Sequence, residues 1–226
     1  LVATDPTATK VRAADGRAVT GVDISPFITH LPGGADTTSF STENASGSTS
    51  QAASIIESLE LGARTLLIDE DTSATNLLIR DTRMRDLVAA EKEPITPLVD
   101  RVTSLTEAGV SLIMVVGGSG AFLDAADRVL MMDNYRCLDV TSRAREVVAD
   151  LPRPRTDEPT SWEAAPRVPS AKARVDRPRT KASGTSVLTI DRSTVDISDV
   201  AAVVDPGQAE AIAWCVRGVL EEMAGK

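Results

Sequence analysis

Two adjacent carboxylates follow a short apolar run in this chain. The run TLLI at residues 65–68 is typical of a strand buried on both faces of a sheet, and Asp69 and Glu70 follow it directly. Open parallel sheets bind ligands at the carboxyl ends of their strands. There Asp69 can hold a Mg²⁺ ion with its water shell, and Glu70 can polarise an attacking water. The pair predicts nucleotide hydrolysis; the alternative is a strand that ends in acidic turn residues.

A run of hydroxyl side chains and glycine, ASGSTSQ at residues 45–51, opens a predicted helix upstream of the carboxylates. Backbone N–H groups at a helix start, the positive end of the helix dipole and serine hydroxyls together form an anion site. Such runs also simply cap helices, which is the alternative here. Ser46 precedes Asp69 by 23 residues. That length fits one helix, a turn and a strand, so both motifs should lie near the same end of the sheet.

The elements that must position these residues alternate between apolar runs and amphipathic stretches. Strands are predicted within 15–28 and at 65–68, 110–116 and 129–132. Helices are predicted from Thr49 to Gly62, from Thr75 to about Ala90, and after Pro97 to Ala108. Strands that alternate with helices imply an α/β fold with a parallel sheet, flanking helices and right-handed crossovers.

The last third of the sequence predicts an appendage. Residues 151–183 are rich in proline and charge and are expected to form a linker. The segment SVLTIDRSTVDI at 186–197 is typical of a β-hairpin, and residues 206–224 have helical spacing. We therefore expect an α/β part at 1–150, the linker at 151–183, and a β-hairpin plus helix at 184–226.

Composition limits the partners of the chain. The formal net charge is −9, which disfavours a polyanion, and 3% aromatic residues argue against a stacking platform for single-stranded nucleic acid. The Pro-rich stretch is favoured as a solvated linker, and contact with an anionic surface such as a nucleic acid is the alternative. Its basic residues are Arg153, Arg155, Arg167, Lys172, Arg174, Arg177, Arg179 and Lys181.

Cysteine and histidine give no sign of a metal site or a disulfide. Cys137 and Cys215 are far apart and have no Cys or His neighbour at metal-ligand spacing, so we expect two buried, small hydrophobic side chains. His30, the single histidine, lies in a predicted loop and is expected at the surface. The sequence has no apolar stretch of about 20 residues and no signal peptide at its start, and we expect a cytoplasmic protein.

The order of these motifs resembles the ABC ATPases, in which a signature loop, a helix, a Walker B strand and a Ser-Ala loop follow one another. The likeness is closest to a bacterial group described as predicted ATPases of the ABC class, and it covers about residues 15–220. It is carried by VDISPFI, NASGSTSQAA, LLIDEDTSATNLLIRD, EKEPITP, VVGGSG, TVDISDV and VDPGQAEAI. The resemblance implies that residues 1–150 form the second half of an ABC-type P-loop ATPase domain that uses ATP and Mg²⁺.

The resemblance also assigns roles to individual residues. Asp69 would be the Walker B carboxylate that holds Mg²⁺, and Glu70 would be the catalytic base. A homodimer is implied, because the signature loop of one protomer reaches the γ-phosphate of a nucleotide held by the other. In this chain the signature residues would be Ser46, Gly47 and Ser48.

Two further loops follow from the resemblance. Residues 73–76 would form the loop that crosses the dimer interface, with Ser73 and Asn76 near the nucleotide. Family members usually carry a switch histidine after the strand that ends here at Val116, and this chain has Gly-Gly-Ser-Gly at 117–120. Ser119 could supply a hydroxyl to the phosphate; a plain tight turn is the alternative.

The phosphate-binding loop Gly-x-x-x-x-Gly-Lys-Ser/Thr does not occur in the sequence. The segment GGADTT at residues 33–38 has glycines and hydroxyls but no lysine. In the resembled family this loop lies ahead of the region that matches here, and the chain starts with Leu1 rather than Met. We therefore expect a fragment of an ABC-class ATPase that hydrolyses ATP at a dimer interface. The alternative is a non-hydrolysing binding or scaffold protein.

Overall fold

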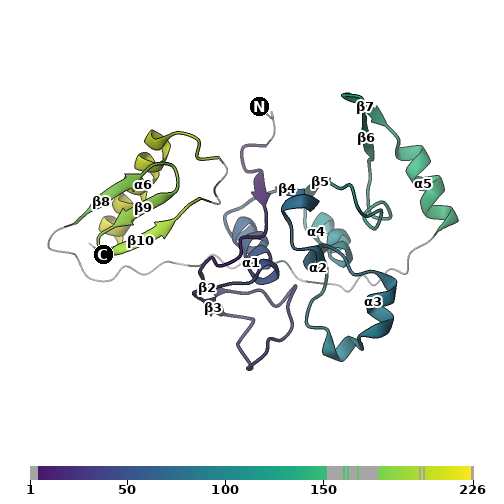
Figure 1. Cartoon of the computed structure of the whole chain (residues 1–226), viewed down its shortest axis with the longest axis horizontal. Helices are drawn as coiled ribbons and strands as arrows, with labels where there is room; N and C mark the ends of the chain where they lie inside the picture. Colours follow the sequence, from purple (N-terminus) through teal and green to yellow (C-terminus); the bar gives the residue numbers. More distant parts are fainter. Residues whose placement is uncertain are drawn as a thin grey trace. The chain divides into compact units, whose positions relative to one another are not determined.

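The computed structural model describes residues 5–151, 160, 162, 167, 178–198, 200 and 202–224. The chain forms two compact units, Leu1–Pro166 and Arg167–Lys226 (Figure 1). The first contains the predicted site, and the second contains the C-terminal strands and helix.

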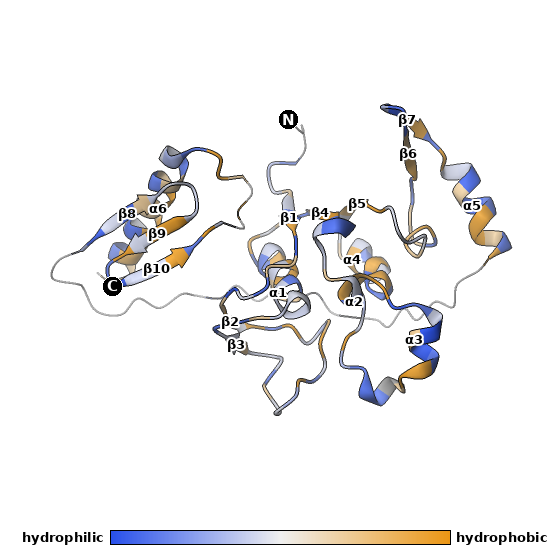
Figure 2. Ribbon diagram, viewed as in Figure 1, coloured by the Kyte–Doolittle hydropathy of each residue, from blue (hydrophilic) through white to orange (hydrophobic). Residues whose placement is uncertain are grey.

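A parallel three-stranded sheet lies at the centre of the first unit, with the strand order β1-β4-β5. These strands are β1 (Thr9–Val11), β4 (Thr65–Asp69) and β5 (Ser111–Val115). Helix α1 (Gly47–Glu60) buries an apolar stripe that includes Ala52, Ile55 and Ile56. The predicted α/β fold with a parallel sheet and flanking helices is therefore confirmed. Figure 2 shows hydrophobic strands β4 and β5, with a hydrophilic segment directly after β4.

The predicted helix from Thr75 to about Ala90 is wrong, because the structure divides this segment. Helix α2 (Thr75–Leu78) ends before an extended break, α3 (Thr82–Leu87) follows, and a 3-10 turn, η2, spans Ala90–Lys92. The physical reason lies at Asp81, whose Oδ1 accepts a hydrogen bond from the backbone N of Met84 at 3.0 Å. An aspartate in this position caps the start of a new helix.

The next elements along the first unit lead into β5 and then away from the sheet. A 3-10 turn η3 (Leu98–Asp100) and helix α4 (Val102–Glu107) precede β5. The predicted strand at 129–132 appears as β6 (Leu130–Asp133), which pairs antiparallel with β7 (Arg136–Asp139). Asn134 and Tyr135 form the turn with φ of 46° and 64°, the conformation that suits a two-residue hairpin. Helix α5 (Thr141–Asp150) follows this hairpin. Earlier in the chain, β2 (Val19–Val22) and β3 (Phe40–Thr42) form a separate two-stranded antiparallel sheet.

Strand β5 is partly exposed, although its sequence predicts a strand that is buried on both faces. Ile113 is 54% exposed and Val115 is 63% exposed. Within the described part of the chain, β5 pairs only with β4 and therefore lies at the edge of the sheet. The exposure follows from this edge position, because a strand with one neighbour is covered less than a central strand.

Part of the expected linker packs on the first unit. The ring centroid of Trp162 lies 5.5 Å from that of Phe27, and its Nε1 donates to the hydroxyl of Ser104 at 3.0 Å. Among the basic residues expected in the linker, Arg167, Arg179 and Lys181 are described. The other five, Arg153, Arg155, Lys172, Arg174 and Arg177, lie outside the described residues.

The second unit packs a three-stranded antiparallel sheet against one helix. The predicted hairpin is confirmed as β9 (Val187–Ile190) and β10 (Ser193–Asp196). A third strand, β8 (Thr180–Ser183), pairs with β9 although these residues were expected in the linker. Helix α6 (Pro206–Ala224) is also confirmed and buries Ala209 and Ala213.

The predicted burial of the two cysteines is wrong. Cys137 and Cys215 are both exposed and both carry free thiols. Cys137 lies on the exposed hairpin strand β7, and Cys215 lies on α6. His30 is exposed, as expected. Among the described residues, no helix combines the length and the apolar character that crossing a membrane requires.

Candidate functional site

Glu70 stands at the carboxyl end of β4 and reaches across to the loop after β5. Its Oε2 accepts hydrogen bonds from the backbone N of Gly117 at 2.7 Å and of Gly118 at 2.8 Å. The parallel register pairs Asp69 with Val115, so both strands end at the same level. The N–H groups of Gly118 and Gly117 lower the pKa of Glu70 below its ordinary value. The two hydrogen bonds thus stabilise the ionised form of the carboxylate.

Asp69 ends β4 and is half-buried. Its Oδ1 accepts a hydrogen bond from the backbone N of Asp71 at 3.1 Å and caps the 3-10 turn η1 (Glu70–Thr72). In the described part of the chain, no three His, Cys, Asp or Glu side chains gather closely enough to hold a metal ion. One carboxylate nevertheless fits Mg²⁺ that arrives with a nucleotide, because Mg²⁺ takes most of its other ligands from phosphates and water.

The start of α1 carries the predicted signature residues. Ser46 is the N-cap, and its Oγ accepts a hydrogen bond from the backbone N of Thr49 at 3.4 Å. Ser46 itself is exposed, whereas Thr49 is buried. A Cβ added at Gly47 would lie 3.2 Å from Asp15 Oδ1 and 3.7 Å from Ala74 Cβ. The helix start is therefore packed closely on its inner side and open at Ser46.

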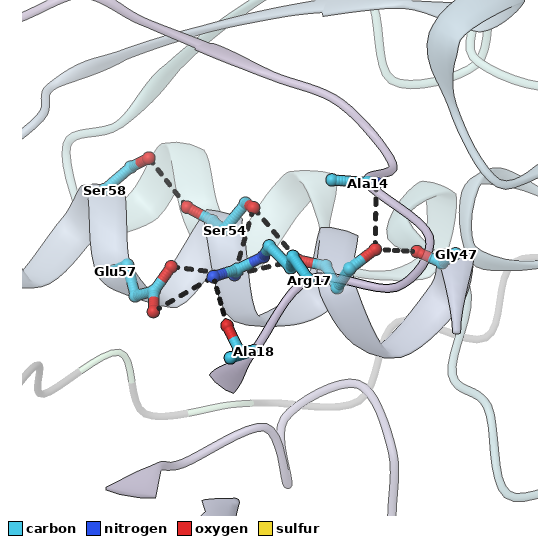
Figure 3. Close-up of polar contacts among 8 residues, drawn as sticks. Ala14, Arg17, Ala18, Gly47, Ser54, Glu57 and Ser58 are labelled. Carbon is cyan, nitrogen blue, oxygen red and sulfur yellow. Dashed lines mark hydrogen bonds and ion pairs between the residues drawn. The ribbon is translucent and has the colours of Figure 1, made fainter. Parts of the chain in front are cut away.

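A polar network holds α1 against the segment that precedes β2 (Figure 3). The buried hydroxyl of Ser50 accepts from the backbone N of Ala14 at 3.0 Å and donates to the carbonyl of Gly47 at 2.9 Å. The guanidinium of Arg17 donates to Glu57 at 2.8 Å. It also donates to the carbonyl of Ser50 at 3.1 Å and to the hydroxyl of Ser54 at 3.2 Å. These contacts fix the position of the helix that presents Ser46.

Sequence reasoning did not find this network, although one signal was present. Ser50, Ser54 and Glu57 follow helical spacing and so share one polar stripe on α1. A polar stripe on a helix that also carries apolar residues can face solvent or a buried partner. The sequence does not identify Arg17 as that partner.

Gln51 connects α1 to the loop after the carboxylates. This side chain is fully buried. Its Nε2 donates to the hydroxyl of Ser73 at 2.9 Å, and its Oε1 accepts from the backbone N of Ala74 at 2.8 Å. The hydroxyl of Ser73 in turn donates to the carbonyl of Asp69 at 2.7 Å. A continuous chain of hydrogen bonds thus runs from α1 to the end of β4.

The remaining predicted site residues fall into two places. Ser48 donates its hydroxyl to Asn76 Oδ1 at 2.8 Å, so the start of α1 and the loop at 73–76 touch directly. Ser119 instead accepts a hydrogen bond from the backbone N of Ala121 at 3.1 Å, within its own turn. The contacts therefore bring Ser48, Ser73 and Asn76 into one region and join Glu70 to residues 117–118.

We expect Gln51→Met to lower the free energy of unfolding of residues 1–226 by about 1–3 kcal/mol, because it leaves the part-buried N–H of Ala74 without its acceptor. Urea denaturation would measure the change. Asn76→Ala is the control, since it removes an exposed contact of the same loop and should cost less than about 0.5 kcal/mol. Equal effects of the two substitutions would contradict a supporting role for Gln51.

Comparison with known families gives two matches, one on each side of residues 168–178. A family model described as ABC_ATPase, P-loop domain, matches residues 1–167. A second, described as MRB1590 C-terminal domain, matches residues 179–226, which contain β8 to β10 and α6. A search of curated proteins finds no match.

Proposed function

Since the chain belongs to the ABC_ATPase family of P-loop domains, we propose that it supplies the signature loop and the catalytic carboxylates of a shared ATPase site. The family resemblance expected from the motifs is confirmed by this match. One observation carries the proposal: hydrogen bonds through Gln51 and Ser73 connect the start of α1 to the end of β4, where Asp69 and Glu70 follow one another.

In the proposed reaction, each group of this chain has one task. Glu70 orients a water molecule and takes its proton as the water oxygen bonds to the γ-phosphorus. The bond from the γ-phosphorus to the bridging oxygen then breaks, and ADP and phosphate leave. Asp69 would hold a Mg²⁺ ion, which would supply positive charge beside the phosphate oxygens. The start of α1 contacts the γ-phosphate of a nucleotide that is bound to the opposite protomer of a homodimer. The contacting residues are Ser46, Gly47 and Ser48.

The proposal requires a phosphate-binding loop, which residues 1–226 do not contain. We propose that another segment supplies it, and we call the protein that combines this chain with that loop the complete ATPase. The coding DNA upstream of Leu1 tests this. An in-frame Gly-x-x-x-x-Gly-Lys-Ser/Thr motif would support the ATPase. A start codon close to Leu1 would instead support the second candidate, a binding or scaffold protein that does not hydrolyse ATP.

We expect residues 1–226 alone to bind ATP–Mg weakly or not at all. The signature loop contacts only the γ-phosphate, and the lysine and N–H groups that anchor the β- and γ-phosphates are missing. Isothermal titration calorimetry of residues 1–226 would measure this, with the complete ATPase as the positive control. A micromolar Kd for residues 1–226 would show that the chain anchors ATP by other groups.

A further inference from the structure

The loop after β5 donates two backbone hydrogen bonds to the Glu70 carboxylate, and none of the sequence motifs predicts this contact. Two successive backbone N–H groups, those of Gly117 and Gly118, converge on one oxygen, Oε2, of the Glu70 carboxylate. The other oxygen, Oε1, lies beside Gly118, where an added Cβ would come within 2.8 Å of it. The carboxylate therefore occupies space that a side chain at residue 118 would take.

We propose that Gly118 is a positioning residue for Glu70. Its N–H group, with that of Gly117, anchors Oε2, and its missing side chain leaves room for the carboxylate to lie against the loop. This inference rests on the proposed role of Glu70 as the base. With Oε2 anchored, Oε1 is the oxygen that accepts the proton of the attacking water. Rigid placement of a base matters, because a misplacement of about 1 Å can cost about 100-fold in rate.

The glycine requirement at residue 118 is steric and does not come from the backbone conformation. Gly118 is not among the described glycines with positive φ, so alanine fits its backbone. An alanine Cβ would instead meet the far end of a flexible glutamate side chain. Gly118→Ala should therefore fold normally and push the Glu70 carboxylate off the two N–H groups.

The loop itself offers two comparisons with the same chemical change. Gly117→Ala keeps its N–H group, and nothing lies within 4 Å of the added Cβ. Gly120→Ala adds a Cβ at 3.5 Å from Leu123 Cδ1, an ordinary contact away from Glu70. Only Gly118→Ala is expected to displace the carboxylate.

Amide NMR of residues 1–226 tests the contact without any nucleotide. A hydrogen bond to a carboxylate shifts an amide proton downfield. We expect the Gly117 proton to lose this shift in Gly118→Ala, and to lose it also in the reference variant Glu70→Ala, which removes the acceptor. The Gly118 proton should keep its shift in Gly117→Ala. If Glu70→Ala leaves both amide protons unmoved, or if Gly118→Ala leaves the Gly117 proton in place, the proposal is overturned.

Kinetics of the complete ATPase test the consequence. Gly118→Ala should lower kcat at least about 10-fold with KM for ATP nearly unchanged, whereas Gly120→Ala should keep the parental kcat. A parental or higher kcat in Gly118→Ala would overturn the positioning role. That failure is distinguishable from failure of the proposed function, because only the latter predicts parental hydrolysis by Glu70→Gln.

Discussion

Glu70→Gln is expected to lower ATP hydrolysis by the complete ATPase about 100-fold or more, in line with the usual contribution of a general base. Glutamine preserves the size of the side chain. It also keeps one oxygen that can accept hydrogen bonds from the N–H groups of Gly117 and Gly118. It cannot take a proton from water. ATP binding should therefore persist, and the ATP-bound dimer should accumulate. Phosphate release would measure the rate, and size-exclusion chromatography with ATP would measure the dimer.

The neighbouring residue provides a matched control for this substitution. Asp71→Asn makes the same change from carboxylate to amide one position further, at an exposed side chain that no proposed step uses. Its rate should stay within about 2-fold of the parent, as expected for a surface site. Parental hydrolysis by Glu70→Gln would remove Glu70 from the mechanism. A similar loss in both variants would indicate an effect of net charge and not of the base.

The sequence predicted those elements whose signal is local. The apolar runs at 65–68 and 110–116 predicted β4 and β5, and the alternation of strands with helices predicted their parallel pairing. Helix α1 followed from its spacing of apolar residues and from the hydroxyl cluster ahead of them; it begins at Gly47, two residues before the predicted start, with Ser46 as its N-cap. One helix prediction failed because a single capping residue interrupts the helical spacing of apolar residues. Asp81 divides the helix expected at 75–90, because a cap for a new helix competes with continuation of the old one.

The candidate site was predictable only in its side-chain chemistry. The residue types and spacing indicated Asp69, Glu70 and the hydroxyl run that includes Ser46. The partner of Glu70 is a pair of backbone N–H groups, and every residue except proline carries such a group, so no residue type marks Gly117 and Gly118 for this task. The exposure of β5 depends on which strands surround it, and this is a property of the sheet that the run of apolar residues does not encode.

Ser46→Arg is expected to abolish hydrolysis by the complete ATPase while each protomer still binds ATP. Ser46 is exposed at the N-cap of α1, where the proposed partner nucleotide would meet it. An arginine there would place a bulky side chain between the two protomers. Ser46→Ala separates the effect of bulk from the loss of the hydroxyl, since it removes the cap and the proposed phosphate contact without adding a large side chain, and it should cost about 1 kcal/mol of stability. Phosphate release and ATP binding would be measured on both variants.

Mixing two inactive proteins tests whether the site is shared. Ser46→Arg protomers are combined with protomers in which the lysine of the phosphate-binding loop is replaced. Each heterodimer then has one site with both defects and one site with neither, because the signature residue and the lysine of one site come from different protomers. Activity should return in the mixture if the protomers exchange and one intact site suffices. If heterodimers form but remain inactive, the shared site is contradicted, and Ser46 keeps only its role as the helix cap seen in its bond to Thr49.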